Sequence, residues 1–287
     1  MAVPPVPLLD AGRIARLRDV LAGGHMGLAP DRQLARSILE RWPGTASLVK
    51  SANDFNSRTA VWAVSGGTPE WPVPPAEGVI FAASGYPVGV KTDRESFRAL
   101  PGGGFHPGAA EQAPRALFVY ADADPGAVLM SKVLLSEPEP LRVSACQVPA
   151  SDPAALLSTP AARVLLDRGP VMVQLQLCAM WWPPELAAWA VAEYGRLLPP
   201  GSTVALSLIV PGGASDSHEF LAAFGGAGGI VYPHTEADIA GWITAADLDL
   251  VPPGVTDVRG RELGWAAAKF GRQQTTARTV GAVAVVR

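Results

Sequence analysis

The stretch "GVIFAASGYPVGV", Gly78 to Val90, runs an apolar segment of strand length directly into a turn that contains Gly85 and Gly89. Cofactor-binding α/β domains begin in this way, because glycine has no Cβ and lets the backbone approach a ligand. The glycine spacing differs from the G-x-G-x-x-G of dinucleotide-binding turns, and no Lys-Ser/Thr pair follows as in a phosphate loop. The residues leave two interpretations open: a ligand-binding turn and an ordinary strand-to-helix connection.

Six further apolar segments follow this first strand: "ALFVYAD", "LRVSACQV", "VMVQLQLCA", "STVALSLIV", "LDLVPPGV" and "TVGAVAVVR". They alternate with helical or loop segments, which is typical of a parallel sheet covered on both faces by helices. We therefore expect a doubly wound α/β fold with a mostly parallel, seven-stranded sheet. In such folds ligands bind outside the carboxyl ends of the strands, where the strand order reverses.

The N-terminal part has a different pattern. Apolar residues recur with helical periodicity in "AGRIARLRDVL", "DRQLARSILERW" and "ASLVKSANDFNSRTAVWAVS", so three helices are expected there. A Pro- and Gly-rich connector, Gly66 to Gly78, comes next. The sequence predicts an N-terminal helical extension over residues 1–70 and a Rossmann-like domain over residues 71–287.

Composition excludes several classes of protein. The chain has 287 residues, a formal net charge of −3 and no long block of like charges, which argues against nucleic acid as a partner. The longest apolar run, "VMVQLQLCAMWW", is well short of the roughly 20 residues that cross a bilayer. Cys146 and Cys178 are too few and too isolated for a disulfide framework or a zinc site, and no metal is expected. The N-terminus lacks an export signal, so we expect a cytoplasmic protein, with homo-oligomerisation left open.

Acidic residues follow the second strand, in "FVYADADP". A carboxylate at such a strand end accepts paired hydrogen bonds from the two hydroxyls of a ribose, and Asp122 is the candidate. It lies 37 positions after Gly85, and the loop "RALPGGGFHPGAAEQAP" accounts for the excess over the usual spacing of about 20. Alternatively, Asp122 and Asp124 cap the helix that begins near Pro125.

Polar and aromatic residues follow the third and fourth strands. Gln147 is placed to meet the amino group of an adenine, and Asp152 is expected to cap the next helix. Trp181 and Trp182 either line a pocket at the sheet edge or belong to the core.

The four histidines show no metal-binding or triad spacing, and surface or loop positions are expected for them: His25, His106, His218 and His234.

The order of these motifs resembles a bacterial family of S-adenosylmethionine-dependent methyltransferases, long catalogued as a domain of unknown function, over nearly the whole chain. The resemblance is carried by "LRDVLAGGHMGLAPDR", "SANDFNSRTAV", "FAASGYPVG", "VYADADP" and "TEADIAGWITAADLDLVPPGV". It implies a Rossmann-like class I methyltransferase fold with S-adenosylmethionine as cofactor. The cofactor-binding positions that it implies are Ser84, Gly85, Tyr86, Pro87, Asp122, Gln147 and His25.

The departures from the family pattern fall in the cofactor site. Phe81 stands where the family loop has Asp, and Ala83 where it has its first Gly. The N-terminal signature of the family has Lys-Asp-Asn where this chain has His25, Met26 and Gly27. The family's cofactor contacts are therefore only partly preserved, and the site is expected to be divergent.

Two functions follow from the resemblance. The first is a methyltransferase for a small molecule, apolar or aromatic if Trp181, Trp182 and Tyr86 line the pocket. The second is a degenerate pseudo-methyltransferase that serves as a ligand-binding or interaction protein. A third, more distant interpretation is different chemistry on the same fold, such as a cyclisation. The direction of the Phe81 ring distinguishes them: a ring in the core leaves the cofactor site open, and a ring in the cofactor cavity excludes methylation.

Overall fold

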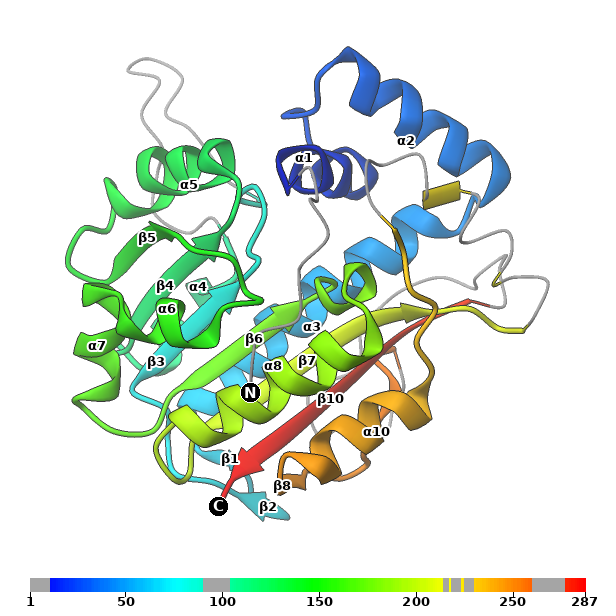
Figure 1. Cartoon of the computed structure of the whole chain (residues 1–287). Helices are drawn as coiled ribbons and strands as arrows, with labels where there is room; N and C mark the ends of the chain where they lie inside the picture. The colour runs from blue at the N-terminus through cyan, green and yellow to red at the C-terminus, as the bar shows by residue number, and fades with distance from the viewer. Residues whose placement is uncertain (1–10, 90–103, 214–216, 218–222, 225–229, 260–276) are drawn as a thin grey trace.

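A central sheet of eight strands organises the computed structural model, which describes residues 11–89, 104–213, 217, 223–224, 230–259 and 277–287 (Figure 1). The strand order is β5-β4-β3-β6-β7-β10-β8, and β9 pairs with β10. The first five strands of this order are parallel, whereas β10 runs antiparallel to β7, β8 and β9. The bounds are β3 Gly78–Ala82, β4 Leu117–Asp122, β5 Val143–Gln147, β6 Met172–Gln176, β7 Thr203–Val210, β8 Leu248–Leu250, β9 Thr256–Asp257 and β10 Arg278–Val286.

All seven apolar segments form strands, and the predicted fold class is confirmed. Every residue of β3, β6 and β7 is buried, which explains why these strands read as continuous apolar runs. Side chains alternate between the two faces of β3. Ile80 and Ala82 join one core cluster, and Val79 and Phe81 join the other.

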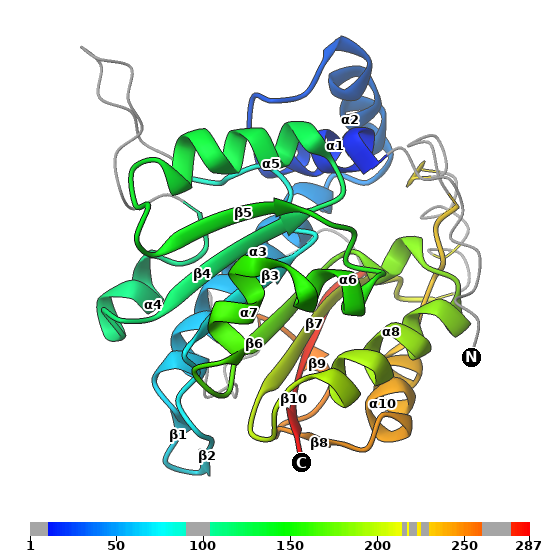
Figure 2. The same ribbon diagram turned by 60° about the vertical axis from the view of Figure 1, so that its left-hand side comes forward.

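Helices cover both faces of the sheet. Figure 2 shows α6, α7 and α8 on one face and α3 on the other. The helices after the first strand have these bounds: α4 Pro107–Gln112, α5 Pro125–Ser131, α6 Pro153–Ser158, α7 Pro160–Leu166, α8 Pro184–Leu197 and α10 Glu236–Ala245. A π-helical turn, η1 (Lys132–Ser136), extends α5, and a 3-10 turn, η2 (Ala179–Trp181), follows β6.

Carboxylates begin two of these helices, as expected from the sequence. Asp124 accepts hydrogen bonds from the backbone N–H groups of Gly126 and Ala127 at the start of α5, at 3.0 and 3.2 Å. Asp152 accepts one from Ala155 at the start of α6, at 3.0 Å. Each cap satisfies backbone donors that have no partner inside the helix.

The three predicted N-terminal helices are present as α1 (Ala11–Ala22), α2 (Ala29–Arg41) and α3 (Thr45–Val64). Buried polar groups join α3 to the sheet. The Gln174 amide donates to the Asn56 carbonyl and to the Thr59 hydroxyl, both at 2.9 Å, and the Thr279 hydroxyl donates to the Leu48 carbonyl at 2.8 Å. Helix α3 therefore packs as a layer of the α/β structure, while the domain boundary at residue 70 stays a prediction.

The connector after α3 contains a small antiparallel hairpin, β1 (Gly67–Thr68) and β2 (Trp71–Pro72), which the sequence did not predict. Gly66 and Gly67 adopt φ values of 82° and 84°, which glycine reaches without a steric cost. Within the described ranges, no helix combines the length and the apolar character needed to span a bilayer.

Substitution of a glycine in β10 tests the packing of α3 on the sheet, and substitution of a glycine in α10 is its control. A Cβ on Gly281 of β10 would lie 2.7 Å from side-chain atoms of Phe55 and Val258, so Gly281→Ala is expected to lower the free energy of unfolding by roughly 1–3 kcal/mol. Gly241 lies exposed inside α10, with nothing within 4 Å of its Cβ position. Gly241→Ala is the matched control and should raise the free energy of unfolding by roughly 0.5–1 kcal/mol. Urea unfolding measures both, and changes of the same sign would contradict this packing.

Candidate functional site

The turn after β3 has an unusual backbone. Ala83 adopts φ 55°, Gly85 φ 67° and Gly89 φ 62°, all in the left-handed region. Glycine reaches this region freely, whereas a residue with a Cβ pays roughly 1–2 kcal/mol. The turn stays attached to the neighbouring strand, because the Ser84 N–H donates to the carbonyl of Ala121 at 3.0 Å. Ala83 thus carries strain at the position where the resemblance places a glycine.

Asp122, the last residue of β4, connects this turn to the next strand. Its Oδ2 accepts the backbone N–H of Gly85 at 2.7 Å, and its Oδ1 accepts that of Asp124 at 2.9 Å. The side chain is buried, and this burial raises the pKa of Asp122, against the lowering effects of the two N–H donors and of Arg18. Asp122 therefore organises the turn itself, and only Asp124 acts as the helix cap.

Arg18 of α1 crosses over the turn, and the sequence analysis missed it. Its Nη1 donates to the Ala83 carbonyl at 2.8 Å, and the guanidinium carbon lies 3.6 Å from where a Cβ on Gly85 would stand. The side chain as a whole is half-buried, but its Nε is buried and has no hydrogen-bond partner. Burial lowers the pKa of Arg18, and Asp122 is the main opposing influence. The available signal was an arginine between Leu17 and Leu21, the two leucines that α1 buries in the core.

A small cavity lies under Arg18. Its lining includes Arg18, Asp19, Asn53, Ser84, Gly85, Tyr86 and Phe105. Its volume is about 10 Å³, which is about the room that one water molecule needs. The structure thus brings Ser84, Gly85 and Tyr86 together at one cavity, and Pro87 follows them half-buried.

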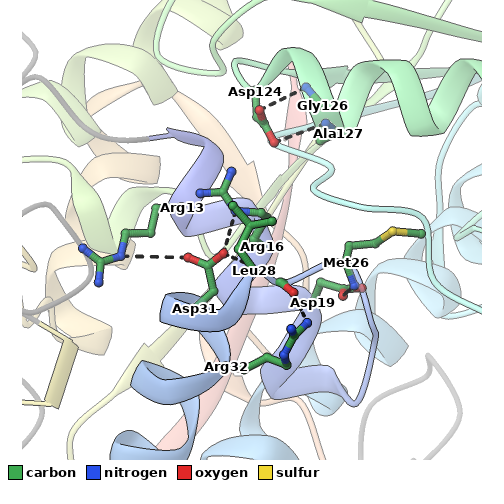
Figure 3. A network of polar contacts seen from close by, with 11 residues as sticks. Arg13, Arg16, Asp19, Met26, Leu28, Asp31, Arg32, Asp124, Gly126 and Ala127 are labelled. Carbon is green, nitrogen blue, oxygen red and sulfur yellow. Dashed lines mark hydrogen bonds and ion pairs between the residues drawn. The ribbon is translucent and has the colours of Figure 1, made fainter.

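Two other arginines of α1 lie close to one carboxylate of α2. Figure 3 shows Arg13 and Arg16 pointing to Asp31, which also accepts the backbone N–H of Leu28 at 2.9 Å. The Arg16 Nε donates to Asp31 Oδ2 at 2.7 Å, and the Arg13 Nε lies 4.0 Å from Asp31 Oδ1. These contacts hold α1 against the start of α2.

Tyr86 links the turn to the start of α5. Partial burial raises the pKa of its hydroxyl to about 12; a hydrogen bond with Asp124 adds to the rise, and Arg16 opposes it. A Cβ on Gly126 would lie 2.6 Å from the Tyr86 hydroxyl, so this glycine leaves the room that the ring requires.

The Phe81 ring points into the core. It is 1% exposed and packs against Phe105, Phe118 and Tyr120, with ring centroids 5.5, 6.5 and 4.7 Å away. The sequence left open whether this ring lies in the core or in the cofactor cavity. The structure places it in the core, and it does not line the cavity.

Gln147 and His25 lie at the periphery. Gln147 pairs with Asp122 in the β4–β5 register, and its exposed side chain donates to the Ala123 carbonyl at 3.2 Å. His25 is exposed in the turn after α1. Burial raises the pKa of the nearby Asp19 carboxyl, and the Met26 N–H and His25 oppose this rise. Their roles toward a cofactor stay predictions.

Trp181 and Trp182 belong to the core. They are 3% and 4% exposed, and Trp181 meets Phe224 edge-on at 6.5 Å. Neither tryptophan lines the cavity beside Gly85.

Two histidines lie in loops, as expected, but both are buried instead of lying at the surface. His106 Nδ1 lies 2.9 Å from the Tyr120 hydroxyl, and its Nε2 lies 3.3 Å from Glu139 Oε1. His234 Nε2 lies 3.0 Å from the carbonyls of Ala179 and Trp182. His218 lies outside the described residues. Within the described part of the chain, no group of three or more metal-ligating side chains occurs.

The comparison with known families decides the identity. The family model of the S-adenosyl methyltransferases matches residues 102–287. The chain belongs to this family. S-adenosylmethionine is therefore its cofactor, and the strand order describes a class I methyltransferase fold.

Solved structures share the whole fold. A DUF574 family protein from Streptomyces avermitilis is 21% identical, with a TM-score of 0.78 over 96% of this chain and 97% of that one. A putative methyltransferase from Thermobifida fusca is 21% identical, with a TM-score of 0.77 over all of both chains. No curated protein matches the chain in sequence.

Relief of the strain at Ala83 gives a test of the turn. Ala83→Gly removes the steric cost of φ 55°, partly offset by the greater chain entropy of glycine, and should raise the free energy of unfolding by up to about 1 kcal/mol. Ala82→Gly, in the buried strand just before, should lower it. Chemical denaturation of both variants is the measurement, and a loss at position 83 as large as at 82 would refute a strained turn.

His106 gives a pH test. Burial lowers its pKa below the ordinary 6.5, although Glu139 acts in the opposite direction. The unfolded chain then takes up the proton first, so the stability contributed by neutral His106 is present above pH 6.5 and is lost as the pH falls below it. This loss is at most about 1.4 kcal/mol per pH unit.

Denaturation between pH 7.5 and 5.5 should show a shallower loss of stability for His106→Gln than for the wild type. The exposed His25→Gln is the matched control and should keep the wild-type slope. Equal slopes in all three proteins would show that His106 does not titrate differently on folding.

Proposed function

We propose that the protein binds S-adenosylmethionine at the carboxyl ends of β3 and β4 and transfers its methyl group to a small molecule. The strand order β4-β3-β6 supports this place. After β3, the chain adds β4 on one side of it and later adds β6 on its other side. Ligands of doubly wound sheets bind where the strand order reverses in this way. The single observation that carries the proposal is the Asp122 carboxylate at this edge, bonded to the glycine of the turn.

The residues present fit the chemistry of the cofactor. A carboxylate has about four lone-pair positions, so Asp122 can accept from ribose hydroxyls in addition to its two backbone donors. The absent Cβ of Gly85 permits a close approach, and the unpartnered Arg18 Nε offers a donor. The cavity of about 10 Å³ has room for about one water molecule, so it would hold only a small part of the cofactor.

Each predicted site residue has a proposed part in binding. Ser84, Gly85 and Pro87 bring the backbone of the turn to the cofactor, and Asp122 holds the ribose. Tyr86 fixes the turn to α5 through Asp124. Gln147 on the adenine side and His25 above Asp19 complete the proposed set.

When bound, S-adenosylmethionine would supply an electrophilic methyl group: the substrate nucleophile would bond the methyl carbon as the carbon–sulfur bond breaks, with the electron pair left on the thioether sulfur of S-adenosylhomocysteine. The chain's own contribution is to position the two reactants and to exclude water. Tyr86, Val88 and Phe105 give the cavity an aromatic and apolar wall, which favours an apolar or aromatic small molecule as substrate. A cytoplasmic location stays part of the proposal.

A second candidate function is ligand binding without methyl transfer. The observation that favours it is the missing carboxylate at position 81 of the cofactor loop, although the Phe81 ring itself lies in the core and leaves the cavity open. On this view the site is divergent enough to keep the fold and lose the reaction.

Calorimetric titration with S-adenosylmethionine and S-adenosylhomocysteine tests cofactor binding. The wild type is expected to bind with a Kd of roughly micromolar order. Asp122→Asn should weaken binding about ten- to a hundredfold, because it removes a charged acceptor. Asp152→Asn, a helix cap away from the cavity, should leave affinity unchanged. No binding of either ligand at roughly millimolar concentration would overturn the proposed function.

A further inference from the structure

We infer that Arg18 holds the carboxylate of the cofactor's methionine portion. This inference rests on the proposed function and assigns a binding role to α1, which the sequence marked only as a helix. The binding partner has a definite chemistry: a carboxylate that lies next to an ammonium group.

The hydrogen bonds of Arg18 leave donors available. A guanidinium has five N–H donors, and Arg18 uses Nη1 for the Ala83 carbonyl. Its Nε is buried beside the cavity without any partner. A buried donor without an acceptor is destabilising, so this position is unfavourable until an acceptor binds.

The charge of Arg18 is also incompletely balanced. Arg13 and Arg16, on the same helix, pair with Asp31. Arg18 forms no salt bridge with any side chain in the described ranges, although Asp122 is close enough to raise its pKa. Both Asp122 oxygens already accept backbone N–H groups of the turn. Among the arginines of α1, Arg18 is thus the one whose positive charge is poorly neutralised and whose side chain lines the cavity.

The charge of the turn selects the carboxylate over the ammonium. Residues 81–89 contain no acidic side chain, so the turn offers the ammonium group only backbone carbonyls, and Asp19, the carboxylate that lines the cavity from α1, already accepts the N–H of Met26. A guanidinium lies over the same turn and repels a second cation. Guanidinium and carboxylate, by contrast, form short, charge-assisted pairs that can be bidentate.

Binding requires Arg18 to change partners. Its guanidinium carbon stands 3.6 Å from the Cβ position of Gly85, and its Nη1 is bonded to the Ala83 carbonyl. The hydrogen bond to Ala83 is then exchanged for bonds to the carboxylate.

Two ligands that differ only in this carboxylate test the inference. Calorimetry with S-adenosylmethionine and with decarboxylated S-adenosylmethionine should show that the wild type prefers the former about ten- to a hundredfold. Arg18→Met should remove this preference by weakening only S-adenosylmethionine, and unchanged binding of the decarboxylated ligand also shows that the site is folded. Arg18→Lys should keep part of the preference, because it keeps the charge and loses the planar fork.

Arg13→Met is the matched control. It removes an arginine from the same helix that faces Asp31 instead of the cavity, and it should keep the wild-type preference. The inference is overturned if Arg18→Met binds S-adenosylmethionine as tightly as the wild type or more tightly. It is also overturned if the wild type binds both ligands equally. If the wild type binds neither, the proposed function fails, and the inference fails with it.

Discussion

The carboxylate of Asp122 is the interaction on which the site depends. One buried side chain accepts the N–H of Gly85 from the turn after β3 and the N–H of Asp124 from the loop after β4. The two loops belong to adjacent parallel strands, so this carboxylate fixes both at the same sheet edge. Asp124 can then cap α5, and Tyr86 can reach Asp124. The cavity, Arg18 above it and the start of α5 all follow from this arrangement.

The strands were predictable because burial on both faces leaves a strong trace in the sequence. The "GVIFA" of β3 and the "TVALSLIV" of β7 have no exposed position, and a continuous apolar run is the direct result. The β1–β2 hairpin was missed because its strands are two residues long and its positive φ values fall on glycines, which occur equally in irregular loops. Buried His106 was missed because its partners, Tyr120 and Glu139, are remote in sequence.

The site was also only partly predictable, because some of its contacts join residues that are remote in sequence. Gly85 and Asp122 each follow a strong strand signal, and parallel strands bring their carboxyl ends together, so their meeting could be expected. Arg18 sits on a helix whose periodicity predicts a buried face but does not indicate which sheet edge it crosses. The positions of Trp181 and Trp182 remained open because a tryptophan after a strand suits a pocket and a core equally, and here the core holds both.

The family match begins at residue 102, whereas Arg18, Ala83 and Gly85 precede it. The recognisable part of the chain therefore contains most of the sheet, and the earlier part contributes the helix and the turn that enclose the cavity. The first helix serves both purposes: Leu17 and Leu21 pack in the core, and Arg18 lines the cavity. The cavity thus joins the two parts of the chain, because Arg18 and Gly85 come from the part before the match and Asp122, which holds Gly85, comes from the matched part.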